Sequence, residues 1–153
     1  MRRMLIALAG CLALAGCGGV SNNRSVGLHN VPLPRGAQVA ARVRVCDRGA
    51  NAYCSEQLVV TGSGYASSAD LLNSENARLK QLGWSDNRGS TGKQLAAQSP
   101  GNEYRVYFDT VYNDLLALDM GWIHRSAPIG RALSAAIFDR ASAISVMLVR
   151  GSS

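Results

Sequence analysis

Residues 39–46 alternate between apolar and polar side chains, with three valines on one side and Arg42 and Arg44 on the other. A period of two is typical of a strand with one buried face. A second apolar run over 56–61 ends at a Gly-Ser-Gly turn and predicts a partner strand. The two runs therefore predict a β-hairpin near the start of the folded part of the chain.

Residues 67–83 have the pattern of an amphipathic helix. Ser67 and Asp70 fit a capping box, with Asp in the place usually taken by Glu. The apolar face comprises Leu71, Leu72, Leu79 and Leu82. Gly83 suits the left-handed position that ends many helices, and Trp84 would then fold back on the last turn. The pattern predicts one well-bounded helix.

A short strand is expected at 84–86, followed by a loop over 87–102 that is rich in Gly, Ser and Gln. Long loops tend to be functional or disordered, and the sequence does not distinguish the two. Residues 89–93 look like a phosphate-binding loop but lack the glycine spacing of the Walker pattern. We therefore assign no site to this loop.

Residues 103–112 alternate sharply, and 115–122 continue with apolar residues at every second position. A three-residue turn between them would place both apolar sets on one face, because a one-residue slip would mix the faces. The pattern predicts a second hairpin. In that register Asp109 lies opposite Asp119 on the outer face.

Directly opposed like charges are destabilising, so Asp109 and Asp119 would share a proton, bind a cation or meet a basic neighbour. We favour basic neighbours, because Arg105 shares the outer face and the arginines of the first strand could extend an ion-pair ladder.

A second helix is expected to begin at Ser126, with Pro128 in its first turn. Its apolar positions are Ile129, Leu133, Ile137, Ala141, Ile144 and Leu148. Charged residues interrupt the run, so it is not a membrane span. Together the elements predict an α+β fold: an antiparallel sheet of four to five strands from two ββα units, with both helices packed on one face.

The N-terminus has the order of an export signal. Arg2 and Arg3 precede an apolar run over 4–14, which is too short for an ordinary membrane-spanning helix. The run ends in Leu14-Ala15-Gly16-Cys17.

This ending resembles the lipobox of bacterial lipoproteins. The resemblance implies that residues 1–16 are a signal peptide and that Cys17 receives a diacylglyceryl thioether and often an N-acyl group such as palmitate. Two or more acyl chains anchor a protein stably in a bilayer. We therefore expect an extracytoplasmic protein that is lipid-anchored to the cell membrane, or to an outer membrane if the host has one. Residues 17–36 would be the lipidated cysteine and a flexible tether, and 37–150 a single domain.

The lipobox resemblance also distinguishes the roles of the four cysteines. Cys11 lies in the leader and Cys17 carries lipid, which leaves Cys46 and Cys54 in an oxidising compartment. A disulfide between them is expected, and it would set Arg44 opposite Glu56 across the first hairpin. A metal site is the rival interpretation, but two cysteines without a nearby histidine do not complete a tetrahedral set.

Charge and chemistry limit the function further. Removal of the leader lowers the formal net charge from +6 to +4, and the basic residues are scattered, so we expect no nucleic-acid partner. No cofactor is implied. The mature part resembles short lipoproteins of GC-rich bacteria, and that resemblance implies no activity.

We expect a non-enzymatic binding module whose partner is an envelope protein or an anionic envelope polymer. The alternative is a small envelope hydrolase that uses Asp109 and Asp119, or His124.

Overall fold

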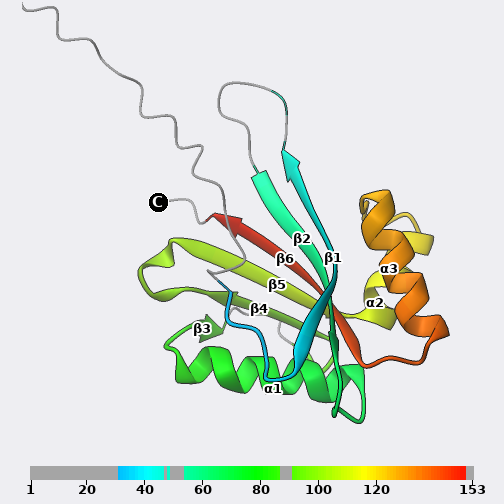
Figure 1. The fold of residues 1–153 in the computed structure, drawn as a ribbon. Coiled ribbons are helices and arrows are strands. Elements are labelled where there is room, and N and C mark those ends of the chain that lie inside the picture. The colour runs from blue at the N-terminus through cyan, green and yellow to red at the C-terminus, as the bar shows by residue number, and fades with distance from the viewer. Residues whose placement is uncertain (1–30, 47, 49–53, 87–90, 151–153) are drawn as a thin grey trace, which may run out of the picture.

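The fold is built on one six-stranded antiparallel sheet (Figure 1). The structure is a computed structural model, and it describes residues 31–46, 48, 54–86 and 91–150. The strand order is β1-β2-β6-β5-β4-β3, so the last strand in sequence lies at the centre. The strands are β1 (Ala37–Cys46), β2 (Cys54–Gly62), β3 (Ser85–Asp86), β4 (Gln94–Gln98), β5 (Tyr104–Thr110) and β6 (Ala143–Arg150).

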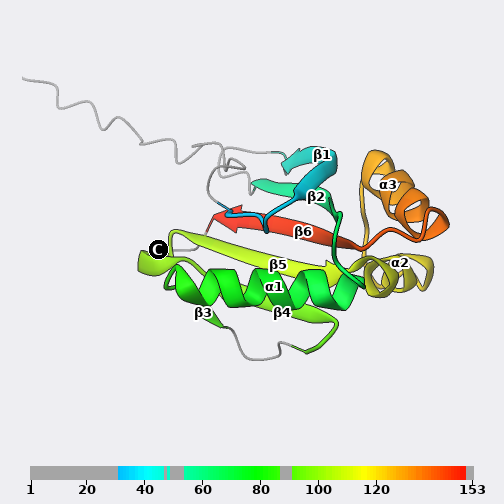
Figure 2. The ribbon, with the colours of Figure 1, turned by 60° about the horizontal axis from the view of Figure 1, so that its bottom comes forward.

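The three α-helices are α1 (Ser68–Gln81), α2 (Val111–Asp119) and α3 (Ala127–Phe138), and a 3₁₀ turn, η2 (Pro100–Asn102), precedes β5. Helix α1 crosses one face of the sheet over β4 and β5, while α2 and α3 lie together at one end (Figures 1 and 2). Among the described residues, none of the helices combines the length and the apolar character needed to cross a membrane.

Two hydrophobic cores lie on opposite faces of the sheet. Leu58 and Val60 point to the face covered by α1, where they join Leu71 and Phe108. Val59 lies between them in β2 and joins the second core, with residues of α3 such as Leu133. Successive side chains of a strand point to opposite faces, so α1 and α3 cover different sides of the sheet.

The α+β class and the antiparallel sheet are confirmed, and so is the first hairpin. Cys46 and Cys54 are directly opposite each other and form a disulfide, with Cα atoms 4.1 Å apart. Arg44 lies opposite Glu56 as expected. The ion pair itself is made by the neighbouring Arg42, whose Nη2 lies 2.6 Å from Glu56 Oε1.

The limits of α1 are also confirmed. Ser67 accepts a hydrogen bond from the backbone N–H of Asp70 at 3.1 Å. At the other end Gly83 has φ +79°, and the N–H of Trp84 donates to the carbonyl of Leu79 at 2.9 Å. These are the contacts of a Schellman motif, which requires a residue that tolerates positive φ.

The second hairpin is wrong, because residues 111–119 form α2 rather than a strand. Val111 and Leu115 pack into the second core, and the helix ends at Gly121 in the same way as α1 ends at Gly83. The apolar residues at every second position therefore point in several directions around a helix. Leu118 faces α3, for example, close to Gly130.

The long second helix is wrong beyond Phe138, where the chain turns back and enters the sheet as β6. Arg140 takes the left-handed conformation at φ +51°, and its N–H donates to the carbonyl of Ile137 at 3.0 Å. Arg140 therefore fills a position that usually belongs to glycine, which is why the sequence carries no clear stop signal. The expectation that both helices share one face is also wrong, as the two cores require.

Two predicted loops contain ordered structure. The loop over 87–102 includes β4 and η2, while residues 87–90 lie outside the described part of the chain. Val31, placed in the tether by the sequence, is buried in the first core with Leu33 packed against the same core. The segment from Val31 onward therefore belongs to the domain.

Candidate functional site

Asp109 lies near the end of β5, on the sheet face opposite α1. Its carboxylate accepts a hydrogen bond from Asn113 Nδ2 at 2.8 Å, from the first turn of α2. Burial raises the pKa of Asp109, and the hydrogen bonds from Gln94 and Asn113 oppose that rise. Asp109 is therefore a half-buried carboxylate held by amide donors.

Asp119 does not meet Asp109. It is exposed at the last turn of α2, and the rise of the helix separates it from the end of β5 by roughly 12 Å. His124 is also exposed, in the segment between α2 and α3. The three predicted candidates are thus distributed over a strand, a helix end and a loop, and Asp119 is too far from Asp109 to share a proton or a cation with it.

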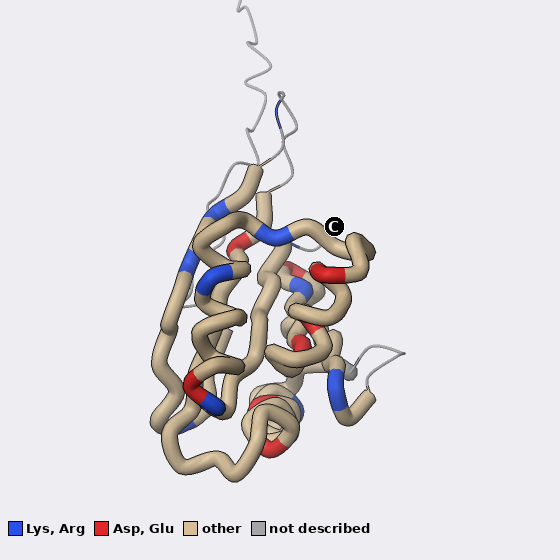
Figure 3. The backbone as a smooth tube through the Cα atoms, turned by 90° about the vertical axis from the view of Figure 1, so that its right-hand side faces the viewer, with Lys and Arg blue, Asp and Glu red and all other residues tan. Residues whose placement is uncertain are grey.

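The predicted ion-pair ladder is absent among the described residues. Arg42 lies opposite Leu58, on the face that α1 covers, whereas Asp109 lies opposite Ser145 on the other face. Acidic and basic positions are interspersed along the traced chain rather than gathered into a stripe (Figure 3). The charged face of the first hairpin therefore cannot neutralise Asp109.

A buried ion pair that the sequence did not reveal lies beside this carboxylate. Asp114 is 1% exposed, and Arg125 donates to it from Nε at 3.1 Å and from Nη2 at 2.7 Å. The two residues are eleven positions apart and belong to no recognisable motif. Their geometry is that of a structural clamp, since both oxygens of Asp114 are occupied.

Glu75 is a second buried carboxyl that sequence analysis missed. It is fully buried in α1, and neither carboxyl oxygen has a hydrogen-bond partner among the described residues. Burial raises its pKa to about 8, against a smaller opposite effect of the nearby Arg78. Its position three residues after Leu72 and four before Leu79, on the apolar face, was a signal that could have found it.

The outward side of α2 is apolar. Tyr112, Leu116 and Met120 are spaced four residues apart, so they lie along one side of the helix, and Trp122 follows. All four are exposed, Trp122 by 71%. We call these four residues the outer α2 surface. At the end of the adjacent α3, Phe138 is also 88% exposed.

The cysteines take two different places. The Cys46–Cys54 disulfide closes the first hairpin at the edge of the sheet. Cys17, to which the lipobox resemblance assigns the lipid, lies outside the described residues, and so do residues 1–16, which the sequence predicts to be a signal peptide.

In the described part of the chain, no three His, Cys, Asp or Glu residues are grouped closely enough to hold a metal ion. No protein-family model, curated protein or solved structure matches this chain.

Proposed function

We propose that this protein is a lipid-anchored interaction module of the bacterial cell envelope. Cys17 holds the chain at a membrane, and the outer α2 surface binds a protein partner. The observation that carries the proposal is the exposure of Tyr112, Leu116, Met120 and Trp122 on one helix and its end. Apolar surfaces of this kind usually mark interaction sites, and Tyr, Trp and Met are enriched at protein interfaces.

The exposure of Trp122 is not imposed by the local chain. Gly83-Trp84 and Gly121-Trp122 end their helices with the same backbone contacts. Trp84 is only 8% exposed because it packs into the first core, whereas Trp122 is 71% exposed. The same local motif thus buries one tryptophan and presents the other, which supports a partner for Trp122.

A protein partner fits this surface better than the bilayer interior does. Asp119 lies on the same outward side of α2 as Tyr112 and Leu116, because residues three and seven positions apart share one side of a helix. Inserting that carboxylate into lipid would be costly, while a protein can offer it a cation or a hydrogen-bond donor. We therefore assign the lipid contact to Cys17 and the outer α2 surface to an envelope protein.

The hydrolase alternative has lost its support. It needed Asp109 and Asp119 within hydrogen-bond reach, or a group that activates His124. Both Asp119 and His124 are exposed, and Asp109 is bonded to Asn113 instead.

Lipid anchoring is tested on its own with Cys17→Ser. In cells fed a labelled fatty acid, the native chain should take up label and fractionate with membranes, and Cys17→Ser should do neither. If the variant still took up label, lipid anchoring through Cys17 would be refuted, and the proposal for the outer α2 surface would be unaffected.

The partner surface is tested with a photo-crosslinking amino acid placed at Leu116. In intact membranes it should give one discrete adduct, which Trp122→Ala weakens strongly. The matched control places the same crosslinker at Asn73, an exposed position of α1 on the other face of the sheet. Adducts equal at both positions, or an adduct indifferent to Trp122→Ala, would contradict an interface on α2.

A further inference from the structure

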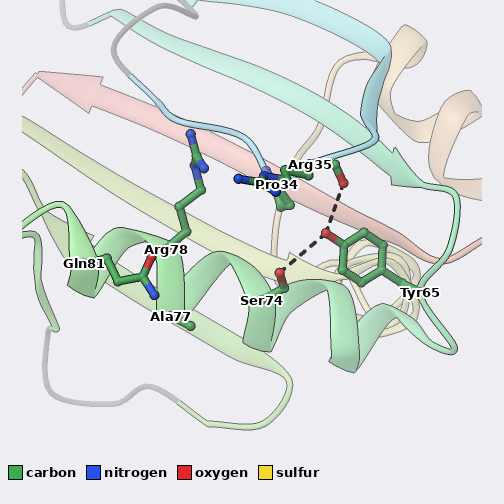
Figure 4. A pocket seen from close by; sticks show the side chains of 7 residues that line it. All are labelled: Pro34, Arg35, Tyr65, Ser74, Ala77, Arg78 and Gln81. Atoms are coloured by element: carbon green, nitrogen blue, oxygen red, sulfur yellow. Dashed lines mark hydrogen bonds between the residues drawn. The ribbon is translucent and has the colours of Figure 1, made fainter.

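A pocket of about 380 Å³ lies between the first described segment and α1 (Figure 4). Its lining residues are Pro34, Arg35, Tyr65, Ser74, Ala77, Arg78 and Gln81. The volume falls at the lower end of the range for small-molecule sites, so the pocket suits a ligand of a few heavy atoms.

The walls of the pocket are fixed by hydrogen bonds rather than by chance proximity. The hydroxyl of Tyr65 donates to the backbone carbonyl of Arg35 at 3.1 Å, which ties the first segment to the turn before α1. The same hydroxyl lies 3.4 Å from Ser74 Oγ, which ties that turn to the helix (Figure 4). Pro34 is buried, so the segment that carries Arg35 cannot swing away freely.

The charge in the pocket is positive and not compensated by described residues. Among the described residues that line it, only Arg35 and Arg78 are charged. Arg78 Nε is buried without a hydrogen-bond partner, and no described carboxylate forms an ion pair with Arg35. A buried donor without an acceptor is costly, so a ligand that supplies one gains binding energy.

Glu75 does not neutralise this charge. It lies in the same helix as Arg78, but its carboxyl oxygens accept no hydrogen bond from any residue that the structure describes. A pKa of about 8 keeps the group mostly protonated at neutral pH. The guanidinium of Arg78 therefore faces the pocket while the neighbouring Glu75 carries little negative charge to neutralise it.

We propose that this pocket binds the phosphate group of a small phosphate ester. Two guanidinium groups match the charge of a phosphate and can donate paired hydrogen bonds to its oxygens. Ser74 and Gln81 add polar groups that can contact the rest of the ester. The ester could be a soluble metabolite or the headgroup of a phospholipid, and both would present the same phosphate chemistry. This proposal does not depend on the outer α2 surface.

The test uses the mature-length chain from residue 17 with Cys17→Ser, so that no lipid anchor contributes. Calorimetric titration with glycerol 3-phosphate and with inorganic phosphate measures soluble ligands. Flotation with vesicles of phosphatidylcholine, with and without phosphatidylglycerol, measures headgroup binding. Arg78→Gln and Arg35→Gln should each weaken binding about tenfold or more, since each removes a charged hydrogen-bond donor to the phosphate.

Two further variants separate a built site from general electrostatics. Arg131→Gln removes an exposed arginine of α3, away from the pocket, and should leave the affinity unchanged. Ala77→Trp fills the pocket from an exposed helix position without changing the charge, and it should abolish binding. Circular dichroism checks that each variant is folded.

The pattern of binding among the probes and variants decides whether the pocket is a phosphate site. Binding of glycerol 3-phosphate alone identifies a soluble ester, and binding of phosphatidylglycerol vesicles alone identifies a headgroup. Either result supports the site if Arg78→Gln weakens the binding about tenfold or more and Ala77→Trp abolishes it. No binding of any probe would overturn the proposal. So would equal losses in Arg131→Gln and Arg78→Gln, because they would indicate attraction to net charge rather than a pocket.

Discussion

Arg125 donates two parallel hydrogen bonds to the carboxylate of Asp114, and the pair is almost fully buried. Asp114 lies in the first turn of α2, where the helix dipole favours a negative charge. Arg125 comes just before α3. The pair therefore fastens the segment between the two helices, which carries Trp122, to the start of α2.

Removing one partner of this pair should be strongly destabilising, because Asp114 is buried and would lose its only ion-pair partner among the described residues. Arg125→Ala leaves the carboxylate of Asp114 buried and unpaired, and we expect the free energy of unfolding to fall by about 3–5 kcal/mol. Urea denaturation monitored by circular dichroism measures the change. Arg131→Ala, at an exposed position of α3, is the control and should change stability by less than about 0.5 kcal/mol. Similar losses in both variants would mean that the clamp has no special role.

Glu75 makes stability depend on pH. Its pKa is raised from 4.5 to about 8 in the folded protein, so the fold retains a proton that the unfolded chain releases. The unfolded state binds fewer protons between these values, and stability should therefore decrease as the pH rises from about 4.5 to 8 and then level off.

Glu75→Gln should remove this dependence while keeping the shape of the side chain. We expect the variant to be more stable than the native chain at pH 8, by a difference on the order of 4 kcal/mol, and similar to it at pH 4.5. Thermal unfolding across the pH range measures both chains, and subtracting the curves isolates Glu75 from other carboxyls such as Asp109. A difference that grows toward acid pH would have the wrong sign and would contradict the raised pKa.

The first hairpin and α1 could be predicted because their local signals are complete. The alternation over 39–46 has one consistent partner, and Ser67 and Gly83 mark both ends of the helix. Local pattern and tertiary environment agree in these segments, which makes the sequence easy to interpret.

The part after β5 could not be predicted for specific reasons. Residues 116–122 carry apolar side chains at every second position, which is the pattern of a strand with one buried face. Three of these apolar side chains are exposed, so the pattern does not report burial here. Gly121-Trp122 was a usable stop signal for α2, since it repeats Gly83-Trp84. Helix α3 ends at Phe138, and Arg140 rather than a glycine takes the left-handed position after it, so the apolar spacing of the helix seemed to continue into β6.

The candidate sites divide in the same way. The disulfide could be predicted, since sorting the cysteines left one pair. The pairing of Asp109 with Asp119 depended on the hairpin register and was wrong with it. The Asp114–Arg125 clamp and the pocket at Arg78 join residues that are distant in sequence, and only the tertiary structure brings them together.

The disulfide should stabilise the domain by closing a short loop in the unfolded chain. For a separation of eight residues, the chain-entropy relation gives about 2–3 kcal/mol. We expect Cys46→Ser with Cys54→Ser to lower the free energy of unfolding by that amount. The native chain under reducing conditions should match the variant, and the variant should not respond to reductant. A native chain that is equally stable with and without reductant would show that the bond contributes nothing.

The two tryptophans allow the partner surface to be separated from the fold. Trp84→Ala should lower stability by about 3–5 kcal/mol, because it empties a buried site in the first core. Trp122→Ala should change stability by less than about 0.5 kcal/mol, since the side chain is 71% exposed. Trp122→Ala should nevertheless weaken the adduct formed from the crosslinker at Leu116. A Trp122→Ala chain that unfolds as easily as Trp84→Ala would mean that Trp122 supports the fold, and its exposure would then no longer argue for a partner.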